Sequence, residues 1–448
     1  MQKALLQKAG LIGLVLLILQ GLLMTIGSVI GERKARQDGV VREIASSHYG
    51  PQVFTGPILS LPYTEEFEET VTAEGVKKTE TRRIERSLRF FPATSEIQGE
   101  ATASTKSRGL FKARIFDWNA TLKGEFVLAQ QNIERSRTQS RIVWGQPILS
   151  IVLNDPRGLI GTPSIKWGEE ALAVEKGSGL PYLGNGLHAR VAKIDLAGPQ
   201  RFVYAMKIGL RGTESLSIVP LANTNHISID STWPHPSFGG QFLPDPQSQQ
   251  VSGNGFKAQW KISALASKAQ QQLLSQLDRS QNCGDASCAE RISIRFIEPI
   301  DIYALSDRAI KYGLLFIVLT FGCFILFEIL KRLPIHPAQY LLVGIAMAIF
   351  FLLLIALSEH IAFAIAYLLA SGASIALLGI YLSAVLRSRW RGLAFGGLLT
   401  MLYSALYGLL VSEDNALLLG SLLLFGLIAL AMIATRHVDW YAINTDGA

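Results

Sequence analysis

Long apolar stretches near the N-terminus and in the C-terminal third dominate the hydrophobic pattern of the chain. Residues 10–30, GLIGLVLLILQGLLMTIGSVI, contain no charge and are long enough to cross a bilayer as a helix. Further apolar stretches of similar length follow residue 309, at residues 312–330, 339–357, 361–386, 393–411 and 416–434. The pattern therefore predicts six membrane-spanning helices, with a long polar segment between the first and the second.

The first apolar stretch has two interpretations. Lys3 and Lys8 precede it, as basic residues precede the apolar core of a cleaved secretory signal. However, the stretch is longer than such a core, and the sequence SVIGERKAR after it offers no small-residue cleavage site. We therefore expect an uncleaved signal anchor at residues 10–30, with residues 1–9 in the cytoplasm.

Basic residues in the connections give the orientation of the helices. Every Lys and Arg after Lys311 lies in three alternate connections, which are KRLPIH (331–336), RSRWR (387–391) and Arg436. The other two connections, SEH (358–360) and SEDN (412–415), contain neither. Lys and Arg favour cytoplasmic loops, so both termini, including the tail 435–448, are predicted to be cytoplasmic and residues 31–311 external. The basic ERKAR run at 32–36 does not fit, but it precedes a large domain, and such domains translocate largely regardless of charge.

Strands dominate the prediction for residues 31–311. In RFVYAMKIGLRG, hydrophobic side chains alternate onto one face at Phe202, Tyr204, Met206, Ile208 and Leu210, and RISIRF (291–296) repeats the pattern. Turn residues break these runs, so the segment is predicted to form a large all-β domain, antiparallel and sandwich-like. Only residues 260–280 have helical spacing, at Leu265, Ala269, Leu273 and Leu277.

A charged hairpin is predicted at residues 65–86, EEFEETVTAEGVKKTETRRIER, which is mostly acidic before Glu74-Gly75 and mostly basic after it. Symmetric pairing about this turn would set Glu66 opposite Arg83 and Glu69 opposite Glu80. A slip of two residues would instead pair Glu68 with Arg83 and Glu69 with Arg82. Opposite charges across strands stabilise either register by a few tenths of a kcal/mol, roughly, so both remain open.

Charge and cysteine content narrow the chemistry. The formal net charge of +7 is spread without a basic block, which argues against nucleic acid as a partner. Cys283 and Cys288 flank GDAS in the external segment, where an oxidising compartment would permit a disulfide, and free thiols are the alternative. The external histidines, His48, His188, His226 and His235, have no metal-ligand spacing, and no nucleophile, zinc or phosphate-binding motif occurs. We therefore expect no metal, no cofactor and no catalytic residue, although an enzyme site assembled by tertiary contact stays open.

A transport path is also weakly supported. Glu328 is the one charged residue within the predicted spans, and it lies one turn from the inner end with Lys331 three residues later. An interfacial ion pair on one helix accounts for this residue without a transport function.

The segment WPHPSFGGQF (233–242) combines stiff, flexible and aromatic residues. The prolines fix the backbone, and the glycines permit a sharp reversal. One interpretation is a structural corner that holds the aromatic rings against the sheets. The other is a ligand or partner groove lined by Trp233 and His235. Both interpretations concern the same residues, which are Trp233, Pro234, His235, Pro236, Phe238, Gly239, Gly240 and Phe242.

Several motifs in order along the chain resemble the CreD family of bacterial inner-membrane proteins. They are IGERKARQDGVVREI (30–44), GPILSLPY (56–63), RGLFKARIF (108–116), LNDPRG (153–158), WPHPSFGGQFLP (233–244) and GFKAQW (255–260). The apolar C-terminal block continues the resemblance, which covers nearly the whole chain. The glutamine-rich stretch at residues 270–290, which contains Cys283 and Cys288, departs from the family pattern.

The resemblance implies a multi-pass protein of the Gram-negative inner membrane that maintains cell-envelope integrity, with residues 31–311 in the periplasm. It implies an association with a carbon-source-responsive two-component regulon, with tolerance to certain colicins and with β-lactam stress, and it implies no enzymatic activity. The expected partners are the lipid bilayer and an unidentified periplasmic or membrane protein, glycan or lipid. The alternatives are an enzyme on a lipid-linked or cell-wall substrate at the outer leaflet, and a transporter.

Overall fold

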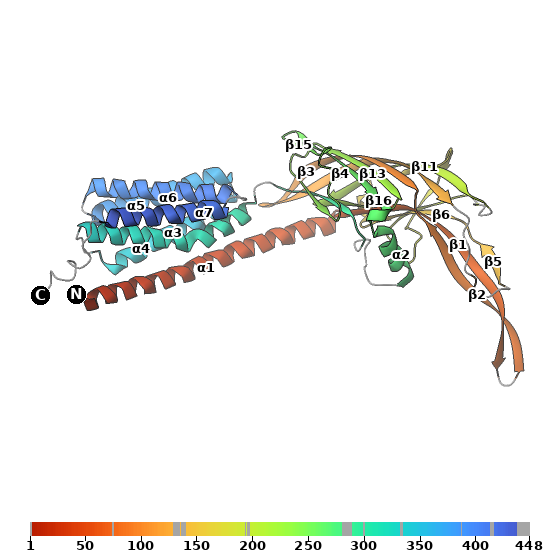
Figure 1. The fold of residues 1–448 in the computed structure, drawn as a ribbon, viewed down its shortest axis with the longest axis horizontal. Coiled ribbons are helices and arrows are strands. Elements are labelled where there is room, and N and C mark those ends of the chain that lie inside the picture. The colour runs from red at the N-terminus through yellow and green to blue at the C-terminus, as the bar shows by residue number, and fades with distance from the viewer. Residues whose placement is uncertain are drawn as a thin grey trace. The chain divides into compact units, whose positions relative to one another are not determined.

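The computed structural model describes residues 2–73, 76–128, 135, 140–192, 194, 198–279, 289–298, 301–331, 335–386, 388–412 and 416–436. The chain divides into two compact units (Figure 1). The helical unit comprises Met1–Asp38 and Ile300–Ala448, and the β unit comprises Gly39–Pro299. Cys283 and Cys288 lie outside the described residues, so their predicted disulfide stays a prediction.

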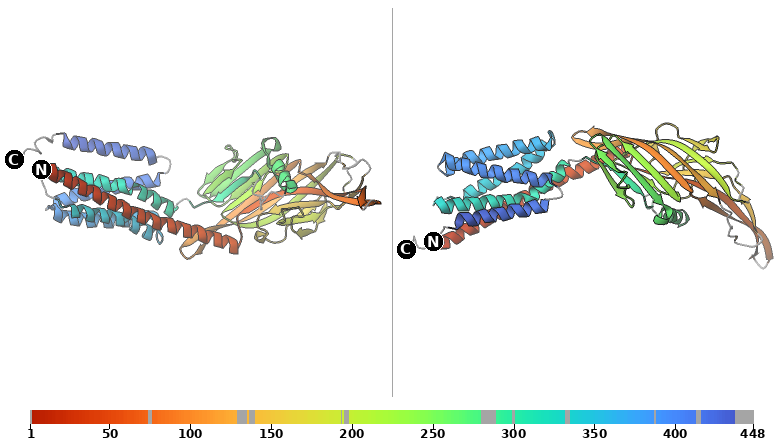
Figure 2. Two further views of the ribbon diagram at one scale, coloured as in Figure 1. Left: turned by 90° about the horizontal axis from the view of Figure 1, so that it is seen from below. Right: turned by 45° about the horizontal axis from the view of Figure 1, so that its top comes forward.

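Long apolar helices form the helical unit and run alongside one another (Figure 2). They are α1 (Gln2–Ser47), α3 (Ile302–Lys331), α4 (Pro337–Ser358), α5 (Phe363–Val385), α6 (Arg389–Val411) and α7 (Ala416–Thr435). Within the described part of the chain, five segments, one in each of α1 and α3 to α6, are long and apolar enough to cross a membrane. The uncharged 20-residue helix α7 coincides with the sixth predicted span, whose crossing stays a prediction.

Close approach of the helices depends on small residues. Gly344 of α4 lies against Leu19 of α1, and a side chain at Gly392 of α6 would meet the Ser383 Cα of α5 at 2.7 Å. Aromatic rings fill the adjacent core, where Phe350 packs on Tyr403 with ring centroids 4.7 Å apart. Because hydrocarbon supplies no hydrophobic force between helices, such close packing is what holds them together.

Two sheets form the β unit. The nine-stranded sheet contains β14 (Pro236–Gly240), β17 (Ile292–Phe296), β12 (Ser215–Val219), β1 (Gln52–Ala73), β6 (Ile148–Leu153), β10 (Gly186–Arg190) and β9 (Val174–Lys176) in that order, and β2 (Val76–Phe90) and β5 (Arg141–Trp144) also pair with β1. The eight-stranded sheet has the order β15 (Gln250–Ser252), β16 (Gly255–Ser263), β13 (Thr224–Ser231), β3 (Thr94–Arg108), β4 (Phe111–Leu128), β11 (Gln200–Thr213), β7 (Ser164–Trp167) and β8 (Glu170–Leu172).

A single apolar core joins the sheets into a sandwich, as the alternating pattern predicts. Tyr204, Met206, Ile208 and Leu210 of β11 are all buried in it. Phe54 of β1 meets Trp118 of β4 edge to face at 5.7 Å, so residues from the two sheets interdigitate. Each such aromatic side chain contributes about 1.5–3 kcal/mol through burial.

The predicted wholly antiparallel topology is wrong at two pairs. Strand β12 runs parallel to β1, and β13 runs parallel to β3. Strands β11 and β12 are joined by Glu214 alone, yet they belong to different sheets. The alternation of apolar residues fixes which face of a strand is buried, but it carries no information about strand direction or partner.

The charged hairpin adopts the symmetric register. Glu66 lies opposite Arg83, and Glu69 lies opposite Glu80. Glu69 forms its ion pair diagonally instead, with Arg82 at 3.0 Å, while Arg83 binds Glu66 at 2.9 Å. The diagonal reach of long side chains thus removes the like-charge penalty that left the register open in the sequence. The hairpin projects from the sandwich (Figure 1).

The helix predicted over residues 260–280 begins later than expected. Residues up to Ser263 continue β16, and α2 covers Ala269–Arg279. Trp260 and Ile262 alternate into the sandwich core, so burial favours the strand there, and Leu265 between the two elements is fully exposed. Leu273 and Leu277 of α2 are buried, as the helical spacing predicts.

Candidate functional site

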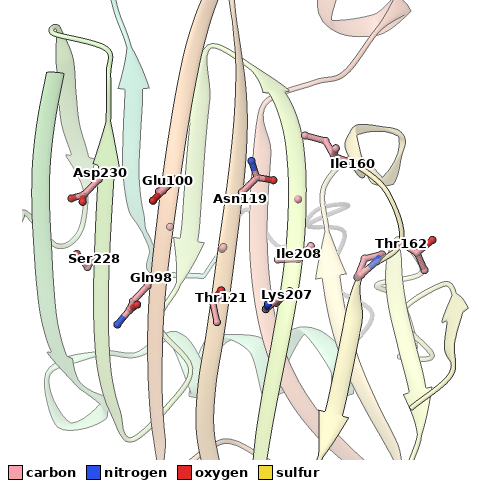
Figure 3. Close-up of a pocket in the computed structure, with 14 residues that line it drawn as sticks. Gln98, Glu100, Asn119, Thr121, Ile160, Thr162, Lys207, Ile208, Ser228 and Asp230 are labelled. Atoms are coloured by element: carbon pink, nitrogen blue, oxygen red, sulfur yellow. The ribbon is translucent and has the colours of Figure 1, made fainter. Parts of the chain in front are cut away.

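The outer surface of the eight-stranded sheet is polar and hollowed, and we call it the polar face. It consists of the outward side chains of β16, β13, β3, β4 and β11, which alternate with buried ones. In β3, for example, Ile97 points into the core, whereas Gln98 and Glu100 point outward (Figure 3). The sheet therefore displays regularly spaced polar groups on a rigid support.

Strand pairing arranges these groups in rows. Ser228, Gln98, Thr121 and Lys207 form one row across four neighbouring strands. Asp230, Glu100, Asn119 and Gly209 form the next row. Residues in a row are spaced by about 4.8 Å, the distance between strands, and the two rows lie about 7 Å apart along the strands.

A short wall borders these rows at residues 160–163. The Ile160 backbone N–H donates to the Gly209 carbonyl at 2.9 Å, which attaches the wall to β11. Gly209 permits this approach, because a Cβ there would lie 3.0 Å from the Ile160 Cβ and 2.9 Å from Asn119 Oδ1. Between the wall and the rows lies an open hollow of about 610 Å³ (Figure 3).

The hollow can form many hydrogen bonds. Amides and hydroxyls line it at Gln98, Asn119, Thr121, Thr162 and Ser228, beside the charged groups of Glu100, Lys207 and Asp230. Asp230 is paired with Lys257 at 3.3 Å. Among the described residues, no group of three or more His, Cys, Asp and Glu side chains could hold a metal ion. The lining is thus suited to binding a polar molecule.

The segment 233–242 lies instead along the edge of the nine-stranded sheet. Its Pro236–Gly240 portion forms β14 and pairs with β17. Phe238 packs edge to face on Phe256 and Trp260, with ring centroids 5.5 and 5.8 Å away. The Trp260 indole N–H donates to the Phe242 carbonyl at 3.2 Å. These contacts hold Phe238 and Phe242 beside the core, and whether the segment acts as a structural corner stays a prediction.

Trp233 and His235 differ in their environments. The Trp233 ring packs against the core, and its indole N–H donates to the Ile297 carbonyl at 3.0 Å and to the His235 carbonyl at 3.2 Å. The His235 side chain is exposed, with its ring 6.4 Å from that of Trp233. Gly240 has a φ of +86°, which permits the sharp reversal that ends β14. Binding of a partner between Trp233 and His235 stays a hypothesis.

Two comparisons connect the chain with known proteins. The family model described as inner membrane protein CreD matches residues 4–441. Inner membrane protein CreD of Escherichia coli (strain K12) is 35% identical over 434 residues, which cover 97% of this chain and 93% of that protein. The chain belongs to the CreD family. The family resemblance seen in the sequence motifs is thereby confirmed, and so is a multi-pass protein of the inner membrane. Both the family and this relative are described as inner membrane proteins, without a catalytic function.

Two of the motifs that resemble the CreD family meet at Arg114. This guanidinium, only 5% exposed as a residue, lies 5.0 Å from the Trp233 ring and pairs with Glu298 at 2.6 Å. It also donates to Thr105 Oγ1 at 2.6 Å. Sequence reasoning missed Arg114, because a basic residue within an alternating strand is normally exposed.

A third motif, LNDPRG, binds the last turn of α1, which belongs to the β unit. Asp155 accepts hydrogen bonds from the Gly50 backbone at 2.8 Å and from Arg157 Nε at 2.8 Å. Arg157 in turn donates to the Ser46 carbonyl at 2.8 Å, in the last turn of α1. Burial raises the pKa of Asp155, but the hydrogen bonds from Arg157 and Gly50 outweigh burial, so this pKa lies below its ordinary value.

Glu328 has partners on two other helices. Lys8 of α1 forms an ion pair with it, and the Tyr340 hydroxyl of α4 donates to it at 3.0 Å. Near the other end of α4, Glu359 accepts from the Tyr303 hydroxyl at 3.1 Å and pairs with Arg33 of α1 at 3.5 Å. An ion pair was predicted for Glu328, but the partner Lys8 comes from a distant segment that helix periodicity cannot reveal.

Proposed function

We propose that this CreD-family protein supports cell-envelope integrity under stress as a non-enzymatic binding protein of the inner membrane. Six helices cross the membrane with both termini in the cytoplasm, and the β unit lies in the periplasm. The distribution of Lys and Arg among the connections supports this orientation. The β unit binds an envelope component, and the membrane helices keep it at the outer surface of the bilayer.

The observation that carries this proposal is the polar face. Its hydrogen-bonding side chains come from adjacent strands of one sheet and line a continuous hollow. Since pleated strands hold their side chains in fixed positions, such a surface binds polar ligands with little loss of conformational freedom. The outward residues are also unnecessary for the sandwich core, which the alternate residues form.

The test is complementation of cells that lack the protein, challenged with a β-lactam or a colicin. A variant with Gln98→Ala, Thr121→Ala and Ser228→Ala should fail to protect at normal abundance. A control variant with Ser104→Ala and Gln249→Ala, both exposed and outside the hollow, should protect like the parent. Equal protection by the two variants would contradict a binding function of the polar face.

A second candidate function is an enzyme on a cell-wall substrate. Glu100 and Asp230 lie opposite each other on β3 and β13, and paired carboxylates can act as acid and base on a glycosidic bond. Asp230 also forms an ion pair with Lys257 at 3.3 Å, so the two carboxylates have different surroundings. Incubation of the purified protein with cell-wall glycan and analysis of the products would distinguish the functions, because a binding protein releases none.

A further inference from the structure

One row of the polar face extends across most of the sheet, and we call it the neutral row. From β16 to β4 it contains Gln259, Ser228, Gln98 and Thr121, and it continues through Lys207 of β11, its one charged member, to Ser164 of β7. The row therefore crosses six strands and is about 24 Å long at the usual strand spacing. Its shape suits a linear ligand that lies across the strands.

The space above the row is continuous. A second hollow of about 430 Å³ shares Gln98 and Ser228 with the first hollow of about 610 Å³. It extends to Trp260 and Lys261 of β16. Volumes in this range are typical of ligand sites. The two hollows thus adjoin at Gln98 and Ser228 and follow the neutral row from β16 to β11.

Charges border the neutral row on both sides and nearly cancel. One flanking row holds Lys257, Asp230 and Glu100, and the other holds Lys261, His226, Glu96 and Lys123. With Lys207, these three rows carry four lysines against three carboxylates. A polyanion such as a phosphate-rich surface needs a basic groove, so this near balance argues against it.

The side chains of the row indicate the chemistry of the ligand. Amides and hydroxyls each donate and accept hydrogen bonds, which matches a ligand with hydroxyl and amide groups along its length. An acyl chain would need apolar lining, whereas the neutral row supplies none. A peptide would need a free sheet edge or apolar side-chain pockets, and the middle of a sheet face offers neither.

We infer that the polar face binds a linear glycan strand that carries hydroxyl and acetamido groups, laid across the strands along the neutral row. This inference rests on the proposed function, in which the β unit binds an envelope component. Gln98 and Gln259 would pair with acetamido groups, and Ser228 and Thr121 with hydroxyls. None of the row residues is aromatic, so the row itself provides no ring to stack on the sugars, and the affinity of a short oligosaccharide is expected to be weak.

The experiment uses the full chain in lipid nanodiscs and a soluble tetramer of N-acetylglucosamine, with binding measured by saturation-transfer NMR and titration. The parent should bind saturably, and a glucose tetramer of the same linkage, which lacks acetamido groups, should bind more weakly. The variant with Gln98→Ala, Thr121→Ala and Ser228→Ala should lose at least tenfold in affinity, since two hydrogen bonds of ordinary strength contribute about 1.4 kcal/mol or more. The control with Ser104→Ala and Gln249→Ala should bind like the parent.

The outcomes separate the inference from the proposed function. If the parent does not bind the tetramer, or the triple variant binds it equally, the glycan inference is overturned. If that happens while the triple variant still fails to protect cells, the proposed function stands with another ligand. If the tetramer binds and the triple variant loses it while cells remain protected, the inference stands and the proposed function is wrong. Circular dichroism of each variant confirms that the β unit is folded.

Discussion

The energetic coupling between Arg114 and Trp233, measured as unfolding free energy, tests most directly whether the segment 233–242 is a structural corner or a binding groove. The Trp233→Leu variant loses the indole hydrogen bond to Ile297 and the contact with the Arg114 guanidinium 5.0 Å away. These two interactions contribute about 1 kcal/mol each, so we expect the variant to lose about 2 kcal/mol of unfolding free energy. The aliphatic side chain of leucine retains part of the apolar contact.

The Arg114→Met variant should lose a similar amount. It removes the ion pair with Glu298 and the hydrogen bond to Thr105, both at 2.6 Å, and the same contact with Trp233. Release of the buried guanidinium from its desolvation offsets part of this loss, and the exposed Glu298 carboxylate can be hydrated, which gives about 2 kcal/mol. Since the ring contact is lost only once, the double variant should lose about 3 rather than 4 kcal/mol.

The assay is urea unfolding of the full chain in detergent, followed by far-ultraviolet circular dichroism of the strands. His235→Ala is the matched control, and we expect it to change neither stability nor envelope protection, because that side chain is exposed. Additivity of the Arg114 and Trp233 effects within about 0.5 kcal/mol would contradict the coupling. Loss of protection in His235→Ala or Trp233→Leu at unchanged stability would establish the groove.

The remaining predictions concern Asp155, Gly209, Glu328 and the orientation. Because its pKa is lowered in the folded chain, Asp155 contributes stability that is present above the unfolded pKa of 3.8 and is lost as pH falls through the folded pKa. Asp155→Asn should therefore reduce the loss of unfolding free energy at acidic pH. An unchanged loss would contradict the role of Asp155. Gly209→Ala should displace the wall at residues 160–163 and cost about 1–3 kcal/mol, or several degrees of melting temperature, whereas Gly253→Ala, which has open space around it, should melt like the parent. Glu328→Gln should leave envelope protection intact, since the carboxylate binds Lys8 and Tyr340, and loss of a transported solute on this substitution would favour a transporter. A cysteine in place of the exposed Glu170 should react with a membrane-impermeant maleimide in cells whose outer membrane is permeabilised. A fluorescent protein fused after Ala448 should be fluorescent, as it would be in the cytoplasm. No reaction at residue 170 together with no fluorescence would contradict the proposed orientation.

The sequence predicts features that depend on local signals. Helix length and apolar composition predict α3 to α6 within a few residues at most boundaries, and the alternation in residues 202–210 predicts which side of β11 is buried. The predicted span at 312–330 begins later than α3 does at Ile302, because the first turns of α3 are more polar. Asp301 caps their N-terminus, since its carboxylate accepts from the Tyr303 backbone at 3.0 Å. Hydropathy delimits only the apolar part of a helix, whereas the helix itself extends as far as its backbone hydrogen bonds.

The polar face could not be predicted in the same way. The strands that contain Glu96 to Glu100 and His226 to Asp230 alternate in the sequence, which indicates two faces but does not mark the outward residues as a ligand surface. Their assembly into rows depends on the parallel pairing of β3 and β13, which are far apart in the sequence. Glycine at position 209 also gave no signal of a ligand hollow, because its role appears only once residue 160 lies beside it.

Glu214 shows where local rules give way to tertiary structure. It has a φ of +66°, which is unfavourable for a residue with a side chain, and burial raises the pKa of its carboxyl. The contacts of Glu214 explain why the chain tolerates both the unfavourable φ and the buried carboxyl. Its carbonyl accepts from the Phe296 backbone at 2.9 Å near the segment that leaves the β unit, and its carboxylate accepts from the Arg114 backbone at 2.9 Å. The adjacent Thr213 binds Tyr49 at 2.7 Å in the segment that enters the unit.

The one-residue turn at Glu214 therefore has three structural roles. It passes the chain from the sheet of the polar face to the other sheet, and it binds both segments through which the β unit connects to the helical unit. Lys207 and Gly209 of the polar rows lie on the strand that ends at this turn. A longer, relaxed connection could change sheets equally well, but it would not hold the entering and leaving segments beside the same two residues. The strained backbone at Glu214 is thus the consequence of closing the sandwich at the point where the chain enters and leaves it.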